Sequence, residues 1–139
     1  MFDLKNGQYL MNGQALVSNN GRFKIVMQDD GNLVIYIDSC KICKRAETPI
    51  WASRSQHKGY APYKLVMQGD NHLCIYSACG ACIWANGMHG KGRGKVEARM
   101  QDDGNFVVYD EDEAAVWCTR TDGGCKADEE YQGCGYKIM

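Results

Sequence analysis

The feature that most constrains the fold is a ten-residue pattern that the 139-residue chain carries three times, at 27–36, 67–76 and 100–109. Each copy begins with Met-Gln and ends with Tyr, and an apolar residue followed by Trp comes after it. The three tryptophans are Trp51, Trp84 and Trp117. The Trp follows the Tyr by eight residues in the second and third copies and by fifteen in the first, which therefore carries a seven-residue insertion. Three copies of one unit predict a single domain with pseudo-threefold symmetry.

Each copy has the pattern of a β-hairpin. In the first copy, residues 29–31 form a three-residue loop in which Gly31 supplies the positive φ that the turn needs. Met27 then pairs with Leu33, and strand alternation places the apolar residues of both strands on one buried face. In the second copy Asn71 takes the glycine place, which Asn tolerates better than most residues. Since no long stretch has a helical period, the sequence predicts an all-β fold.

The opposite face of each hairpin is mixed and faces outward. In the first copy its residues are Gln28, Asp30, Asn32, Val34 and Tyr36. Positions on one face lie about 6–7 Å apart, so the span from Asn32 to Tyr36 is roughly 13 Å, about the size of a sugar ring. Turn and strand propensities explain a single copy of this pattern without any function. Three copies that keep the outward Gln, Asp and Tyr predict a binding site for a neutral polyol.

The pattern Gln-x-Asp-x-Asn-x-Val-x-Tyr resembles the signature of the bulb-type (monocot-type) mannose-binding lectins. Two copies match it in full: Gln28, Asp30, Asn32, Val34 and Tyr36, and Gln101, Asp103, Asn105, Val107 and Tyr109. The resemblance covers residues 1–120 and leaves 121–139 as a C-terminal tail. It implies a β-prism of three four-stranded antiparallel sheets with pseudo-threefold symmetry. It also implies one sugar site per sheet, and three Trp packed near the axis.

The same resemblance implies a role for each residue type in the motif. Asp and Asn would hold the axial 2-hydroxyl of mannose, Gln the 3-hydroxyl and Tyr the 4-hydroxyl, while Val meets the ring carbons. No metal ion or cofactor is needed for this mode. The middle copy departs from the signature and reads Gln68, Asp70, His72, Cys74 and Tyr76. Because His72 lacks a carboxamide, we expect this second site to be degenerate, with another specificity or none, and mannose binding there as the alternative.

Eight cysteines exceed the single disulfide that the resemblance implies. Four of them form two Cys-x-x-Cys pairs, at 40–43 and 79–82, and the others are Cys74, Cys118, Cys125 and Cys134. Disulfides that fasten the loops and the tail are the first interpretation, and a four-cysteine zinc site is the second. Thiol redox chemistry and free thiols remain as alternatives, although no helix is evident to lower a thiol pKa.

Composition narrows the classes of partner. Charged residues make up 24% of the chain and the net charge is −1, which offers no attraction for nucleic acid or an anionic membrane. No apolar run is long enough for membrane insertion. Histidines at 57 and 89 and the acidic run 110–113 have the pattern of solvated loops, with a calcium role for the run as the alternative. We find no nucleophile–base pair and no paired catalytic carboxylates.

The sequence therefore predicts a non-enzymatic, metal-independent lectin for mannose and high-mannose glycans, with innate defence as a role that the resemblance suggests. The rival hypotheses are a protein-interaction domain on the same fold, and a thiol or zinc enzyme. The resemblance implies a homodimer in which a C-terminal strand of the tail is exchanged between protomers, unless Cys125 and Cys134 fasten the tail to its own chain. The cysteine count favours secretion, whereas the N-terminus lacks a signal peptide, so a cytoplasmic location is the alternative.

Overall fold

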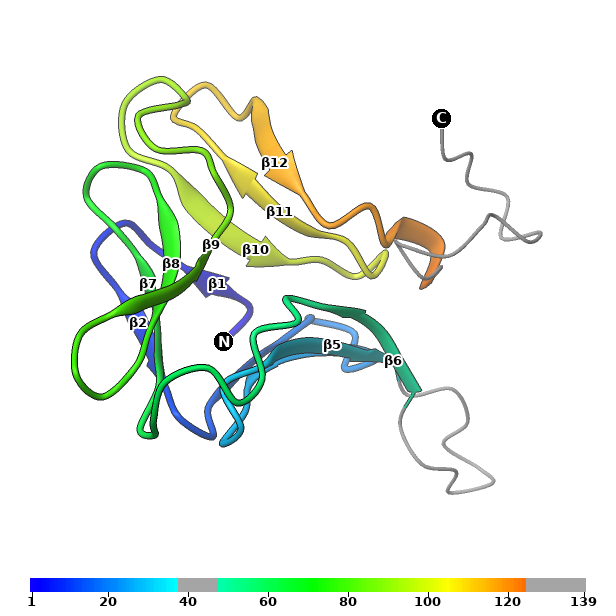
Figure 1. Ribbon diagram of the computed structural model, residues 1–139. Helices are drawn as coiled ribbons and strands as arrows, with labels where there is room; N and C mark the ends of the chain where they lie inside the picture. Colours follow the sequence, from blue (N-terminus) through cyan, green and yellow to red (C-terminus); the bar gives the residue numbers. More distant parts are fainter. Residues whose placement is uncertain (38–47, 125–139) are drawn as a thin grey trace.

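The computed structural model describes residues 1–37 and 48–124, and this part of the chain consists of short antiparallel strands and one 3₁₀ turn at Asp122–Gly124. The strands are β1 (Asp3–Leu4), β2 (Tyr9–Met11), β3 (Ala15–Val17), β4 (Phe23–Met27), β5 (Leu33–Ile37), β6 (Thr48–Ala52), β7 (Lys64–Met67), β8 (Leu73–Tyr76), β9 (Cys82–Ala85), β10 (Glu97–Met100), β11 (Phe106–Tyr109) and β12 (Ala115–Cys118). They form three four-stranded sheets that surround a common centre as the sides of a prism (Figure 1). The predicted fold class is confirmed. No helix in the described ranges has the length and apolar character to span a membrane.

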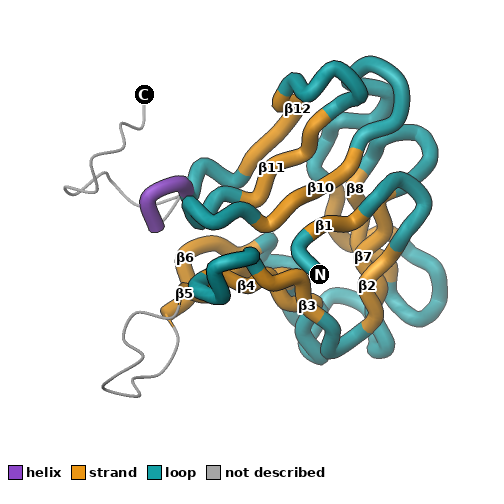
Figure 2. Tube along the Cα trace, turned by 180° about the vertical axis from the view of Figure 1, so that it is seen from behind, coloured by secondary structure: helices purple, strands orange, loops and turns teal. Residues whose placement is uncertain are grey.

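Each repeat supplies three strands of one sheet, and the first seventeen residues supply the fourth strand of all three. Strand β3 joins the sheet of the first repeat, β2 that of the second and β1 that of the third. Figure 2 shows these three short strands lying along β4, β7 and β10. Because β1 and β2 belong to sheets whose other strands come much later in the chain, the N-terminal segment ties the three repeats into one domain.

The core lies between the sheets and is filled by the inward positions of the repeats. Each N-terminal strand adds one leucine to it, and Leu4, Leu10 and Leu16 are all buried. Burying one leucine side chain contributes about 1.5–3 kcal/mol to folding. This burial holds even the two-residue strand β1 in its sheet. The three tryptophans pack edge to face with ring centroids 5.9–6.2 Å apart. The prediction that the three tryptophans pack together is confirmed.

The hairpin loops have the predicted register and backbone. Met27 lies opposite Leu33, and Gly31 and Gly104 have φ of 90° and 93° while Asn71 has 71°. Glycine is also required for space, because a Cβ on Gly31 would lie 2.8 Å from the Tyr63 ring. The tyrosine belongs to the next repeat. A glycine in this loop therefore serves both the turn and the packing of two repeats against each other.

Candidate functional site

The three motifs lie on the outer faces of the three sheets, one on each side of the prism. Site 1 is the face of β4–β5 with Gln28, Asp30, Asn32, Val34 and Tyr36. Site 2 is the face of β7–β8 with Gln68, Asp70, His72, Cys74 and Tyr76. Site 3 is the face of β10–β11 with Gln101, Asp103, Asn105, Val107 and Tyr109. Val34 and Val107 are only 4% and 3% exposed, which makes each of them the floor of its site and not a projecting side chain.

A hydrogen bond between Gln and Tyr forms one end of sites 1 and 3. The Gln28 side chain donates its Nε2–H to the Tyr36 hydroxyl, and Gln101 donates to Tyr109 in the same way. Since the phenol oxygen is the acceptor, its own O–H remains free to donate. The Gln Oε1 is likewise a free acceptor among the described residues. Each site thus presents one acceptor and one donor side by side.

The Asp and Asn side chains form the other end and divide their polar atoms between structure and surface. Asp30 Oδ1 accepts from the Asn32 backbone N–H at 2.9 Å, and Asp103 accepts from Asn105 at 2.9 Å. The second carboxylate oxygen of each Asp bonds no group within 1–37 and 48–124. It therefore remains as an acceptor on the surface.

The Asn oxygen fixes the loop that follows the Trp. Asn32 Oδ1 accepts from the backbone N–H of Arg54 at 2.8 Å and of Ser55 at 3.3 Å. Asn105 Oδ1 accepts in the same way from Thr121 N–H at 3.2 Å. With the oxygen bonded to this loop, the Nδ2 group of each Asn has no partner within the described residues and stays available as a donor, as one Asp oxygen stays available as an acceptor. A hydroxyl group that both donates and accepts would satisfy this pair.

Three asparagines outside the motifs hold the hairpin loops, a role that the motif pattern did not predict. Asn12 Nδ2 donates to Asp29, Asn20 Nδ2 donates to the Asp102 carbonyl at 3.0 Å, and Asn6 Nδ2 donates to the Gln68 carbonyl at 3.0 Å. Each is followed by glycine, in the Asn-Gly pairs at 6–7, 12–13 and 20–21. That pair marks a tight turn, and its threefold occurrence before the first motif was the available signal.

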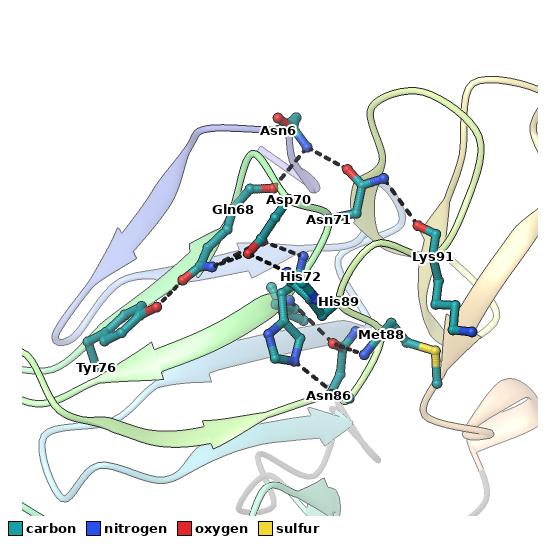
Figure 3. A network of polar contacts seen from close by, with 12 residues as sticks. Asn6, Gln68, Asp70, Asn71, His72, Tyr76, Asn86, Met88, His89 and Lys91 are labelled. Carbon is teal, nitrogen blue, oxygen red and sulfur yellow. Dashed lines mark hydrogen bonds and ion pairs between the residues drawn. The ribbon is translucent and has the colours of Figure 1, made fainter.

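Site 2 has the same frame but a different arrangement of hydrogen bonds (Figure 3). The Gln68 carboxamide is turned around, so that Tyr76 donates to its Oε1 and its Nε2 donates to both oxygens of Asp70 at 3.1 and 3.3 Å. His89 Nε2 lies 3.3 Å from Asp70 Oδ2. The bond from Gln68, with smaller contributions from His72 and His89, lowers the pKa of the Asp70 carboxyl. This carboxylate is already satisfied by its own chain.

The floor of site 2 is a buried thiol in place of valine. Burial raises the pKa of Cys74 to about 12, so it stays protonated and acts as a small apolar group. His72 replaces the motif Asn, and its Nε2 accepts from the Gly87 backbone N–H at 3.2 Å. The imidazole therefore accepts the backbone bond that the Asn oxygen accepts in the other sites.

Site 3 has an arginine and two glutamates beside its tyrosine. The Arg99 guanidinium lies 4.6 Å from the Tyr109 ring centroid and bonds Glu113 with two nitrogens, each at 2.9 Å. A third bond joins Arg99 to Glu97 at 2.9 Å. These bonds raise the pKa of Arg99 above its ordinary value and lower that of the Glu113 carboxyl. Residues 111–113 of the acidic run, predicted to be a solvated tip, are exposed, and Glu113, the last residue of the run, also joins the hairpin to β10 through Arg99.

The structure describes four of the eight cysteines. Cys74, Cys79, Cys82 and Cys118 have free thiols. Cys40, Cys43, Cys125 and Cys134 lie outside the described residues, as does the tail beyond residue 124. The disulfide, zinc and strand-exchange hypotheses therefore stay predictions. Among described residues, no three His, Cys, Asp or Glu side chains are grouped so that they could hold a metal ion.

Comparison with known proteins agrees with this geometry. No family model matches the chain. The B-type lectin plumieribetin of Scorpaena plumieri is 40% identical over 77 residues, which are 55% of this chain and 58% of that protein. A monomeric monocot mannose-binding lectin of Gastrodia elata is similar in structure with a TM-score of 0.75 and 30% identity, covering 88% of this chain and 99% of that one. The snowdrop (Galanthus nivalis) mannose-specific agglutinin, solved with methyl α-D-mannoside, has a TM-score of 0.68 and 32% identity over 84% of this chain and 95% of its own.

Three motif-bearing faces on a three-sheet prism define a lectin of the β-prism class. At this identity and coverage, the chain belongs to the bulb-type mannose-binding lectin family. The matched segment spans little more than half the length of the curated relative.

Proposed function

We propose that the protein binds mannose-containing glycans at sites 1 and 3 without a metal ion and without catalysing a reaction. One observation carries the proposal: at both sites one Asp oxygen and the Asn Nδ2 have no partner within the described residues, and the motif valine is buried. By family resemblance, the Asp–Asn pair meets the axial 2-hydroxyl of mannose. In glucose that hydroxyl is equatorial, and a polar group left unpaired by the wrong epimer costs about 1–3 kcal/mol.

The charge of these sites also suits a neutral ligand. Each motif has a single ionised group, the Asp, and its other members are amides, a phenol and an aliphatic group. Beside site 3 the charge of Arg99 is paired with Glu97 and Glu113. A carboxylate bonded by a sugar hydroxyl needs no counter-ion at the point of contact. We therefore propose that binding is independent of metal ions, and binding in the presence of a chelator tests this directly.

A shallow monosaccharide site gives affinities near the millimolar range, about −4 kcal/mol. Useful binding therefore depends on several sites acting on one branched glycan or one cell surface, where linkage adds about two to four orders of magnitude. Sites 1 and 3 lie on different sides of one chain. A homodimer through residues 121–139 would carry four sites and stays a prediction, which sedimentation equilibrium would check. Secretion belongs to the same proposal, since glycans of this class are displayed outside cells.

The test is retention on mannose-agarose in the presence of EDTA, followed by elution with methyl α-mannoside or, separately, methyl α-glucoside. We expect retention that the mannoside releases and the glucoside does not. The double variant D30N/D103N keeps an acceptor for the turn bond from the backbone N–H two residues later but loses the charged acceptor, and it should pass through unretained. Retention of the double variant would mean that another surface binds the resin. Failure of the wild type to bind would favour a protein-interaction domain on this fold.

A further inference from the structure

In site 2 the polar groups of the motif bond one another and a neighbouring loop of the same chain. In sites 1 and 3 the Asp carboxylate keeps one free oxygen, whereas both oxygens of Asp70 have partners within the described chain. Gln68 supplies two of these contacts, and the backbone N–H of His72 supplies another at 3.1 Å. The last comes from His89, which lies on the loop after β9 and outside the motif. A ligand hydroxyl has no unoccupied acceptor to meet here.

The repeats show where His89 stands in relation to the other sites. The backbone N–H of Gly90 donates to the Asp70 carbonyl at 2.8 Å. At the same place His57 donates to Asp30 and Gly123 donates to Asp103, both at 2.7 Å. The residues just before these three donors are Gln56, His89 and Asp122. They are the equivalent positions of the three repeats, and of the three only His89 bonds the motif carboxylate in the described structure.

Two further features hold His89 over the carboxylate (Figure 3). Its ring packs edge to face on His72, with centroids 5.7 Å apart and an interplanar angle of 64°. The loop that carries it is anchored by Asn71, whose Nδ2 donates to the carbonyls of Lys91 at 3.1 Å and Gly94 at 2.8 Å. The glycines in the other two motifs have no side chain to make such bonds. The substitutions at 71, 72 and 89 thus act together on one loop.

We propose that His89 is a specificity-determining residue that closes site 2 to mannose by occupying the hydroxyl position on Asp70. This inference rests on the proposed function of sites 1 and 3. It makes the protein a lectin with two open sites and one site that is filled by its own side chain.

The experiment is a titration of the ¹⁵N-labelled protein with methyl α-mannoside, in which the backbone amides of residues 32, 72 and 105 report the three sites separately. In the wild type we expect saturable shifts at Asn32 and Asn105, and binding at His72 at least tenfold weaker. The variant H72N/C74V/H89Q restores the motif and borrows glutamine from position 56. It should bind at residue 72 with a Kd within threefold of the other sites.

The matched control is H72N/C74V, which restores the motif but keeps His89, and it should remain at least tenfold weaker at residue 72 than the triple variant. The single variant H89Q changes only an exposed side chain and should bind there at least threefold tighter than the wild type. Equal binding by the control and the triple variant overturns the proposal, as does an unchanged H89Q or a silent triple variant with responding residues 32 and 105. Silence at both of those residues in the wild type contradicts the proposed function itself, and this inference with it.

Discussion

Asn32 and Asn105 perform two tasks with one side chain. The oxygen of Asn105 accepts from Thr121 N–H and from the Thr119 hydroxyl, both at 3.2 Å, and so fixes the loop after β12. Its Nδ2 has no partner within the described residues. The two tasks belong to different atoms, so substitutions can separate them.

Replacing Asn105 with Asp keeps an acceptor for the loop but removes the Nδ2 donor and adds a second negative charge to the motif of Asp103. We expect N105D to change the free energy of unfolding by about 1 kcal/mol or less, and to weaken mannoside binding at site 3 at least tenfold. N105A, which also loses the loop contact, should be less stable than N105D by about 1 kcal/mol. Urea unfolding and the site-resolved titration measure the two effects, with Asn32 as the internal reference. Intact binding by N105D would show that Nδ2 is not a recognition donor.

Gly31 combines a positive φ with a close approach to the Tyr63 ring, 2.8 Å from the position of an added Cβ. G31A should therefore lower the free energy of unfolding by about 2–4 kcal/mol, the sum of backbone strain and overpacking. Gly21 has a similar φ of 75° but no atom within 4 Å of an added Cβ, so G21A should lose only about 1–2 kcal/mol. Urea denaturation of both variants isolates the packing effect as their difference. Equal losses would mean that Tyr63 moves aside freely.

At the scale of elements, the sequence predicted what repeats and alternation can encode. The hairpins followed from a loop glycine and alternating apolar residues, and the site residues of the two intact motifs lie together on one face as the pattern indicated. The N-terminal strands were not predicted, because elements of two or three residues are too short for any period to appear. Leu4, Leu10 and Leu16 recur every six residues, and each is followed by an Asn-Gly turn.

The contact of His89 with Asp70 was equally beyond the sequence. His89 was assigned to a solvated loop, and its side chain is indeed mostly exposed. What the sequence could not supply is the fold of the loop over the neighbouring hairpin, which depends on a backbone bond from Gly90 to the Asp70 carbonyl. A bond between two backbone groups does not depend on residue type, so the sequence does not indicate it.

An ion pair between Arg99 of β10 and Glu113 joins the β11–β12 hairpin to its neighbouring strand, and the strength of this contact should depend on pH. The two bonds from Arg99 lower the pKa of the Glu113 carboxyl from its ordinary value of 4.5. A carboxyl with a lowered folded pKa contributes its stabilisation above the unfolded value, and that contribution is lost as the pH falls through the folded pKa. We therefore expect the hairpin contact to persist at neutral pH and to weaken below about pH 4.5.

Carboxyl ¹³C titration of Glu113 measures this directly. In R99K the single ammonium cannot form the paired bonds of a guanidinium, so the midpoint of Glu113 should move upward toward its ordinary value. Asp110, at the start of the same hairpin loop, is the reference carboxyl: the backbone N–H of Arg93 at 3.0 Å lowers its pKa, so its midpoint should not respond to R99K. An identical Glu113 midpoint in wild type and R99K would show that the pair does not persist in solution.

At the scale of the whole molecule, the prism places its sites on separate sheets that face away from the common centre (Figure 1). Two open sites on one chain would reach different glycans, or different branches of one, and would not converge on a single sugar. Strong binding to a mannan-coated surface should therefore depend on the number of open sites, while binding of free methyl α-mannoside at each site should not.

The variants D30N, D103N and D70N make the same chemical change in each of the three sites. We expect D30N and D103N each to dissociate from a mannan surface at least tenfold faster than the wild type, because every particle loses half of its open sites. D70N should stay within twofold, since Asp70 is already bonded to Gln68 and His89. Surface plasmon resonance on immobilised mannan gives the dissociation rates, and the mannoside titration confirms that the remaining site is intact. A loss in D70N as large as in D30N would mean that site 2 carries avidity after all. No loss in any of the three would place mannan binding away from the motif faces.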